Sequence, residues 1–382
     1  MHKIYITRLL SIFFLLFISS VSVSAQASSK SKFSTPNIYA GIEVGSKGVK
    51  MSVIELKKNA ENGNSFTILK DTSVNTDFIS FTQPTFDATI NGLTRLFNKA
   101  IGDYKIPSSR IFTVISSGVK VQAEKDNKNV WIENFVKAFR SKVNEPERKV
   151  EVVSVLQEAK LSHLGIVPLA RRYNTFLIDI GSGNTKGGFF PYGNDSEFYL
   201  FQLTWGTKST ANATEKMCAE DKSMENFNRQ LVRVAAGAES SEIIYAINSS
   251  GSYPVSDHVA FSGGIAWAAA TLIYPELTNN SVVPVTYEDV QRFAERLSTN
   301  YASLSETAIT DMISDAKWDK SAIGKEVKRV HSVFDQRSLM SGTALLLKIM
   351  RQFKSVNETK QFYLIKNGSV GWVSAYVDQA VE

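Results

Sequence analysis

The chain has 382 residues, with 43 lysines and arginines against 37 aspartates and glutamates, and a formal net charge of +6. This mild excess suits a polyanionic ligand, although a merely basic surface explains it more simply, and we expect no nucleic-acid partner. One cysteine excludes an intrachain disulfide and a zinc site built from thiolates. Four histidines, far apart in the sequence, argue against a histidine metal centre or a phosphohistidine mechanism.

The first 25 residues have the order of a secretory signal peptide. Lys3 and Arg8 precede an apolar run at 9–18, and small residues end at Ala25 before Gln26. The run is shorter than the roughly 18 to 20 apolar residues that a spanning helix needs, and no cysteine follows it to carry a lipid anchor. We therefore expect cleavage after Ala25, a mature chain that is not bound to membranes, and a periplasmic or secreted location.

A Ser- and Lys-rich stretch at 26–36 has no periodicity and predicts a disordered lead-in. The elements expected after it alternate between strands and helices. The first is a strand, a turn and a second strand at 38–56, followed by a helix whose apolar positions are Ile90, Leu93, Phe97 and Ile101. A strand at 111–115 and a helix with apolar positions Trp131, Phe135 and Phe139 come next. A strand at 150–153 and a helix at 155–164 end the series. This alternation predicts an α/β domain over 37–173.

A second unit begins like the first. A buried strand at 176–180 turns at 181–183 and returns at 187–190, and in both units an acid, Glu43 or Asp179, stands between apolar residues just before Gly-Ser. The two acids are 136 residues apart, which suits two duplicated domains better than a solenoid repeat. A third glycine turn at 262–264, helices near 287–304 and 339–353, and a strand at 362–365 complete a second domain over 174–382.

The glycine hairpins are candidate anion sites. Backbone amides of such turns approach phosphate oxygens closely, and two hairpins that face each other could hold a phosphate chain. Further donors and positive charges come from Ser46, Ser182, Asn184, Thr185, Lys47, Lys50 and Lys186. An acid at a strand end, such as Asp179, typically holds Mg²⁺ through water. A purely structural role for both turns is the alternative.

Three segments resemble motifs of the exopolyphosphatase and guanosine pentaphosphate phosphatase (Ppx/GppA) family. Residues 41–51 are similar to its first phosphate motif and residues 178–185 to its second, while 151–161 is similar to the strand-to-helix segment whose Glu-Ala-Arg/Lys-Leu signature carries the catalytic glutamate. Similar segments at 114–120, 203–206, 260–266 and 337–350 extend the resemblance over almost all of 38–380. It implies an α/β fold of the acetate kinase/Hsp70/actin-like superfamily, with two duplicated actin-like (ribonuclease H-like) domains and an interdomain cleft.

The resemblance also implies roles for individual residues. Glu158 would be the catalytic general base that deprotonates water attacking a terminal phosphoryl group. Its alternative is a solvent-facing acid near a helix N-terminus. Asp179 and Glu43 would hold Mg²⁺. The implied phosphate-binding residues are Gly45, Ser46, Lys47, Lys120, Gly181, Ser182, Gly183, Asn184, Thr185, Lys186, Gly263 and Gly264.

The sequence departs from the family pattern at several of these positions. Glu43 stands where the family usually has Asp, and Lys186 stands where it has an acid that organises metal and water. Lys120 replaces an Arg and loses bidentate phosphate contact. Acids beside the catalytic Glu are replaced by Leu156 and Gln157. These changes predict a site that is less acidic and more favourable to anions.

Two functions follow from the sequence. The first is an exported phosphohydrolase that releases terminal phosphate from polyphosphate or a related phosphoanhydride, because guanosine pentaphosphate is made and used in the cytoplasm. The second is a catalytically weakened module of the same fold that binds polyphosphate or another polyanion, with Lys186 substituting a fixed charge for a metal and contacting phosphate directly. The alternative for Lys186, at a strand start, is a side chain that points to solvent. A homodimer is possible. Because only the two core domains are expected, the enzyme should release few phosphates from a polyphosphate chain before it dissociates.

Overall fold

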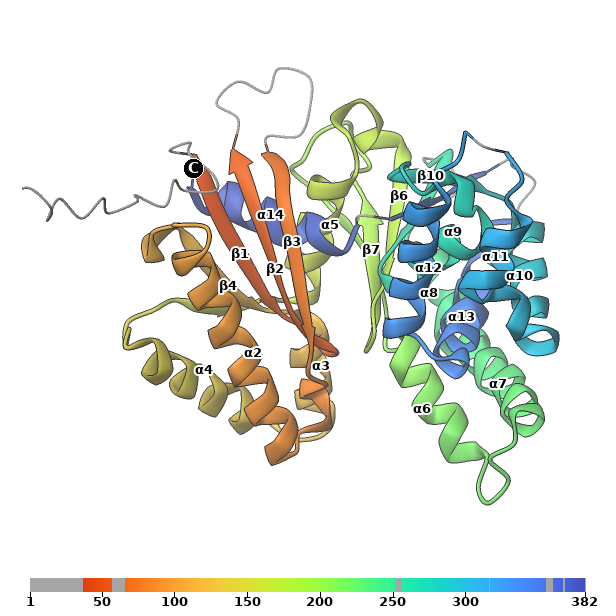
Figure 1. Cartoon of the computed structure of the whole chain (residues 1–382), viewed down its shortest axis with the longest axis horizontal. Coiled ribbons are helices and arrows are strands. Elements are labelled where there is room, and N and C mark those ends of the chain that lie inside the picture. The colour runs from red at the N-terminus through yellow and green to blue at the C-terminus, as the bar shows by residue number, and fades with distance from the viewer. Residues whose placement is uncertain are drawn as a thin grey trace, which may run out of the picture. The chain divides into compact units, whose positions relative to one another are not determined.

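The computed structural model describes residues 37–56, 66–251, 256–315, 317–354, 360–366 and 368–381 (Figure 1). The predicted signal peptide and lead-in lie outside these residues. The described part of the chain forms two mixed β-sheets with helices packed against them, which confirms the predicted α/β class.

The first sheet has the strand order β3-β2-β1-β4-β5. Its strands are β1 Ile38–Val44, β2 Gly48–Leu56, β3 Phe66–Asn75, β4 Ile111–Ile115 and β5 Val150–Val152. Strands β1, β2 and β3 are antiparallel neighbours, whereas β4 runs parallel to β1 and β5 parallel to β4. Strand β1 is almost completely buried, as expected for a central strand covered on both faces.

Helices cover both faces of the first sheet (Figure 1). They are α2 Gln83–Gly102, α3 Ser117–Lys125, α4 Asn129–Val143, α5 Val155–Ile166 and, from the far end of the chain, α14 Gly368–Val381. A Cβ atom at Gly41 would meet Val373 of α14, whereas one at Gly92 of α2 would meet Val49. Gly41 pairs with Ser52, so these two residues project from the same face of the sheet. Val49 is three positions from Ser52 along β2 and, because side chains alternate along a strand, projects from the other face. Helices α14 and α2 therefore pack on opposite faces.

The second sheet has the strand order β10-β11-β9-β6-β7-β8. Its strands are β6 Thr175–Ile180, β7 Thr185–Phe189, β8 Tyr199–Leu203, β9 His258–Ser262, β10 Val282–Val285 and β11 Gln361–Ile365. Strand β6 pairs antiparallel with β7 and parallel with β9, as β1 pairs antiparallel with β2 and parallel with β4. The beginning of the second sheet therefore repeats the beginning of the first.

The helices that follow β8 surround the largest hydrophobic core of the described residues. They are α6 Thr207–Met217, α7 Met224–Ala238, α8 Ile244–Ser249, α9 Gly264–Ile273, α10 Tyr287–Thr299, α11 Glu306–Met312, α12 Lys320–Val333 and α13 Gln336–Lys354. A π-helical turn spans Glu239–Ile243, and short 3₁₀ turns lie at Phe78–Ser80, Ser108–Arg110, Leu169–Asn174, Pro275–Leu277 and Tyr301–Leu304. Within this hydrophobic core, Phe176 packs against Phe189, Phe201 and Phe353, with ring centroids 5.5–5.8 Å apart.

The predicted elements are present, with differences at their ends. Ile101 was expected on an apolar helix face but is 39% exposed, because α2 ends at the next residue. The helix expected over 287–304 ends at Thr299 and continues only as a 3₁₀ turn. Helix α14, which follows the last predicted strand, packs on the first sheet although it belongs to the predicted second domain. Within the described residues, no helix combines the length and apolarity needed to cross a bilayer.

Candidate functional site

Each glycine hairpin places a lysine directly opposite its strand-end acid. Glu43 of β1 pairs with Lys50 of β2, and Asp179 of β6 pairs with Lys186 of β7. Directly opposite residues of an antiparallel pair project from the same face of the sheet. Both hairpins therefore bring one carboxylate and one ammonium group to the same face.

The predicted catalytic residue Glu158 lies in the first turn of α5. Ser154 caps this helix by accepting a hydrogen bond from the amide of Gln157 at 3.1 Å. The Glu158 side chain is buried, and its Oε2 accepts a hydrogen bond of 2.6 Å from the amide of Ser117 at the beginning of α3. The solvent-facing alternative for Glu158 is therefore wrong.

Lys186 joins the two nearest acids. Its Nζ lies 2.9 Å from Oε1 of Glu158 and 2.9 Å from Oδ2 of Asp179, and only 4% of the residue is exposed. Burial alone would lower the pKa of Lys186, but Asp179 and Glu158 outweigh burial and raise it. Burial would likewise raise the pKa of Asp179, but Lys186 outweighs burial and lowers it. The ammonium group of Lys186 is therefore held between the carboxyl groups of Glu158 and Asp179, and the three side chains are an internal ion cluster.

Glu43 completes the acidic side of this cluster. It is buried, and its Oε2 has no hydrogen-bond partner among the described residues. Burial raises the pKa of Glu43, an effect that Lys50 partly offsets and that the charges of Glu158 and Asp179 reinforce. The glutamate that replaces the expected aspartate is therefore the least well-paired carboxyl group of the site.

The two hairpins meet at the N-terminus of α3. A Cβ atom built on Gly118 would lie 3.1 Å from Oγ of Ser46 and 3.2 Å from Oδ1 of Asn184. A Cβ atom on Gly183 would lie 3.4 Å from the same Ser46 oxygen. Both hairpins are thus neighbours of α3, the helix whose Ser117 amide donates to Glu158. This is the arrangement expected of hairpins that face each other. Ser46 and Asn184 are both less than a tenth exposed.

Several predicted phosphate ligands are used within the protein. The amide of Gly45 donates to the carbonyl of Gly48 at 2.8 Å, and the amide of Gly181 donates to that of Asn184 at 3.0 Å, so these two amides close their hairpins. The hydroxyl of Thr185 donates to the carbonyl of Trp205 at 2.7 Å. By contrast, Oγ of Ser182 is buried with no partner among the described residues, so it keeps both donor and acceptor capacity.

Two other predicted cations, Lys47 and Lys120, have partners outside this ion cluster. Lys47 places its Nζ 4.8 Å from the ring centroid of Phe334, and burial and the nearby Lys208 lower its pKa. Lys120 lies on the first turns of α3, where its Nζ is 4.0 Å from Glu124. Neither lysine has an ion pair with Glu158 or Asp179 in the described structure.

The third glycine turn supports Asp179. Gly263 has a φ of +93°, and a Cβ atom there would lie 2.3 Å from the carbonyl oxygen of Ile180 and 3.1 Å from Oδ1 of Asp179. The hydroxyl of the preceding Ser262 donates to that same Oδ1 at 3.0 Å. A Cβ atom on Gly264 would meet the ring of Phe334. The turn therefore packs closely against Asp179, and the glycines are the only sequence signal of this contact.

Sequence reasoning assigned no individual role to three residues that shape the site, namely Ser117, Gly118 and Ser262, although all three lie in segments that carry the resemblance. A signal for the first two exists, because Ser116-Ser117-Gly118 follows a buried strand in the same way as the two recognised Gly-Ser turns. The hydroxyl of Ser117 is buried without a partner among the described residues.

Solved structures reproduce this arrangement of elements. A Ppx/GppA family member from Aquifex aeolicus is 19% identical, with a TM-score of 0.56 over 90% of this chain and 98% of that one. An exopolyphosphatase-like protein has a TM-score of 0.59 at 13% identity, over 90% of this chain and 99% of its own. An exopolyphosphatase from Cytophaga hutchinsonii has a TM-score of 0.54 at 12% identity, over 90% and 98%. The chain has the Ppx/GppA fold.

At these identities the similarity establishes the Ppx/GppA fold and nothing finer. Neither a protein-family sequence model nor a curated protein sequence gives a significant match.

The geometry does not suit a magnesium ion held by Asp179 and Glu43 in the Ppx/GppA manner expected from the sequence. Both oxygens of Asp179 already accept hydrogen bonds, from Lys186 and Ser262, and both oxygens of Glu158 accept bonds from Lys186 and Ser117. In the described ranges, no three His, Cys, Asp or Glu residues are placed to hold a metal ion. The residues as arranged therefore give Mg²⁺ no step in the proposed reaction, and the Mg²⁺ ion expected from the sequence remains untested.

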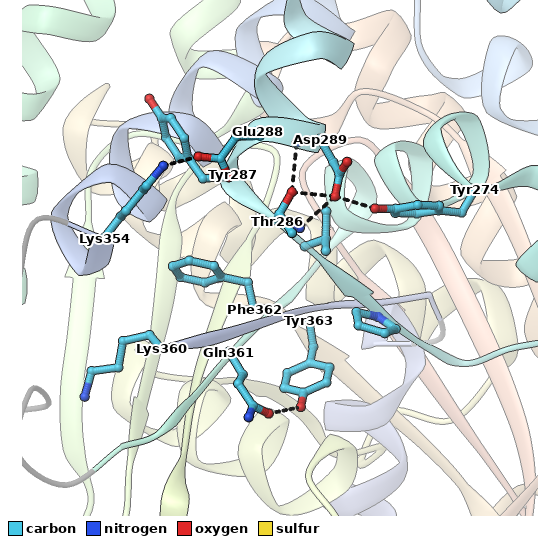
Figure 2. A pocket seen from close by; sticks show the side chains of 12 residues that line it. Tyr274, Thr286, Tyr287, Glu288, Asp289, Lys354, Lys360, Gln361, Phe362 and Tyr363 are labelled. Carbon is cyan, nitrogen blue, oxygen red and sulfur yellow. Dashed lines mark hydrogen bonds and ion pairs between the residues drawn. The ribbon is translucent and has the colours of Figure 1, made fainter. Parts of the chain in front are cut away.

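A cavity of about 510 Å³ lies elsewhere, beside β10 and β11 (Figure 2). Tyr287, Phe362 and Tyr363 line it together with Lys354 and Lys360, and none of the predicted site residues does. Inside it, Lys354 pairs with Glu288, and Tyr274 donates to Asp289 (Figure 2). This cavity is therefore separate from the hairpin site of the Ppx/GppA fold.

Proposed function

We propose that the protein releases terminal phosphate from polyphosphate or a related phosphoanhydride by the attack of water that Glu158 orients and deprotonates. The observation that carries this proposal is the position of Glu158, buried beside the N-terminus of α3 where Ser46 and Asn184 of the two hairpins meet. The fold shared with a Ppx/GppA protein and an exopolyphosphatase supports the same reaction class.

The reaction needs a positioned water molecule and compensation of phosphate charge more than covalent catalysis. A carboxylate has about four acceptor sites. Glu158 uses two of them, for Ser117 and Lys186, and so keeps capacity to accept a hydrogen bond from water. The water oxygen attacks the terminal phosphorus, the bond to the bridging oxygen breaks, and the proton passes to the Glu158 carboxylate. The shortened chain leaves with the bridging oxygen.

The hairpins must separate for a substrate to reach this position. Ser46, Asn184, Glu158 and Lys186 are each less than a tenth exposed. A phosphate group that enters between Ser46 and Asn184 would meet the unpaired hydroxyl groups of Ser117 and Ser182. These hydroxyl groups are the proposed phosphate donors.

The proposed place of action is outside the cytoplasm. The charged, apolar and small-residue order of residues 1–25 supports export. Export in turn favours polyphosphate over a signalling nucleotide as the substrate.

Release of inorganic phosphate from tripolyphosphate, long polyphosphate and ATP tests the proposal. In Glu158→Gln we expect release to fall by about 10²- to 10⁴-fold while tripolyphosphate binding stays within a few-fold, because the general base is lost and ground-state contacts are not. Glu239→Gln is the matched control, because Glu239 is also a buried, ion-paired glutamate, held by Lys348 and Arg351. Turnover by a folded Glu158→Gln protein at the wild-type rate would remove Glu158 from the mechanism.

The second candidate, a binding module with weakened catalysis, is favoured by one contact. The Nζ of Lys186 lies 2.9 Å from Oε1 of Glu158 and occupies a side of the carboxyl group that the attacking water would otherwise use. Under this candidate the wild-type protein binds tripolyphosphate but releases no phosphate. The same assay therefore separates the two functions.

A further inference from the structure

We propose that the ammonium group of Lys186 is a built-in cation that replaces a metal ion, so that the site binds the anionic end of a phosphate chain without a divalent cation. The identity of the ligand rests on the proposed function. The replacement of the metal does not, because it can be tested with metal ions alone.

The fold fixes the ammonium group between carboxylates of different elements. Strand pairing sets Lys186 opposite Asp179, and α5 brings Glu158 to the other side of the same nitrogen. The two distances of 2.9 Å show that the nitrogen lies where a cation shared by both acids would lie. A metal ion can occupy this point only if the lysine leaves it, because the two positive charges would repel each other.

The charges that face this point come from five elements. Glu43 of β1, Glu158 of α5 and Asp179 of β6 supply three carboxyl groups, and Lys50 of β2 and Lys186 of β7 supply two ammonium groups. Without Lys186 the buried acids would face one another with Lys50 as the nearest remaining cation. Such a cluster attracts a divalent ion, whereas the cluster with Lys186 does not.

The ammonium group also retains a donor for a ligand. Lysine has three N–H groups, and in the described structure two of them are directed at Glu158 and Asp179. The third can donate to a phosphate oxygen as a charge-assisted hydrogen bond. A purely structural ion pair would not contribute to phosphate binding, and this difference makes the inference testable.

Metal binding is measured first, by calorimetric titration of Mg²⁺ alone into wild type and Lys186→Glu, with thermal unfolding of both in Mg²⁺ and in chelator. We expect no Mg²⁺ binding and an unchanged melting temperature for wild type. Lys186→Glu should bind Mg²⁺ and melt several degrees higher with it, because an ion that binds the native state alone stabilises that state. Mg²⁺ binding by wild type that Asp179→Asn abolishes would overturn the inference.

Anion binding is measured in chelator with tripolyphosphate as the probe. Lys186→Gln should bind tripolyphosphate at least about tenfold more weakly than wild type, because a charge-assisted contact is lost. This variant keeps a hydrogen-bonding side chain and can be used if Lys186→Glu does not fold. Lys348→Gln is the control, because it removes another lysine that lies 2.9 Å from a buried glutamate, Glu239. It should bind tripolyphosphate with the affinity of wild type. Equal affinity of wild type and Lys186→Gln would overturn the inference. If wild type binds no tripolyphosphate, the proposed function fails, while the Mg²⁺ titration still decides the role of Lys186.

Discussion

Protonation of His163 should destabilise the protein in mildly acidic solution. His163 lies on α5, the helix that carries Glu158, and is completely buried against the rings of Phe190 and Phe198. Its Nε2 is 3.0 Å from the carbonyl oxygen of Thr175, while Nδ1 has no partner among the described residues. Burial lowers the pKa of His163 from 6.5 to about 4, against the smaller opposing effect of the hydrogen bond to Thr175.

The sign of the effect follows from proton binding. Between pH 6.5 and about pH 4 the unfolded chain binds a proton at His163 that the folded protein does not, so stability is complete above 6.5 and decreases as the pH falls through this window. The full shift is on the order of 3 kcal/mol, and about 1.3 kcal/mol of it should appear between about pH 7.5 and about pH 5.5.

Urea unfolding of wild type and His163→Phe at both pH values measures this contribution. Wild type should lose about 1 kcal/mol more free energy of unfolding than the variant over the interval, because the phenylalanine cannot be protonated. His163→Gln serves as a second comparison that retains a hydrogen-bond donor. The reasoning is refuted if all three proteins lose the same free energy of unfolding between the two pH values.

Two further predictions concern other parts of the chain. Gly263→Ala should destabilise the protein by several kcal/mol in urea unfolding, because its φ of +93° and the contact of 2.3 Å with Ile180 leave no room for a Cβ atom. Gly193→Ala is its control, with a φ of +67° and open space, and should cost about 1 kcal/mol; equal losses would contradict the packing argument. Protein purified from its native host should have the mass of a chain that begins at Gln26, and a mature chain that retains Met1 would contradict the export prediction.

The hairpins were predictable because their signals are local. A buried strand followed by Gly-Ser defines each turn, and once the turn is set the acid and the lysine seven residues later must be opposite each other. The Asp179–Lys186 ion pair could therefore have been predicted from spacing. The sequence instead suggested that Lys186 contacts phosphate directly or points to solvent. The solvent alternative is wrong, because the residue is only 4% exposed.

Contacts between distant segments could not be predicted in this way. Helix α14 lacks a polar face and contains Gly368 and Gly371, so its sequence does not indicate a helix. The structure explains these glycines: a Cβ atom on Gly165 of α5 would lie 2.2 Å from the carbonyl oxygen of Gly371, so the two helices approach through glycine. Likewise, the bond from Ser117 to Glu158 joins residues 41 positions apart, and only the packing of α3 against α5 creates it.

Phosphate release from tripolyphosphate by wild type and Glu158→Gln, each in chelator and in Mg²⁺, tests the central claim most directly. The account predicts that wild type releases phosphate in chelator as well as in Mg²⁺, because Lys186 supplies the cation. It also predicts that Glu158→Gln binds tripolyphosphate but releases phosphate about 10²- to 10⁴-fold more slowly in both conditions. Release by a folded Glu158→Gln protein at the wild-type rate would contradict the account.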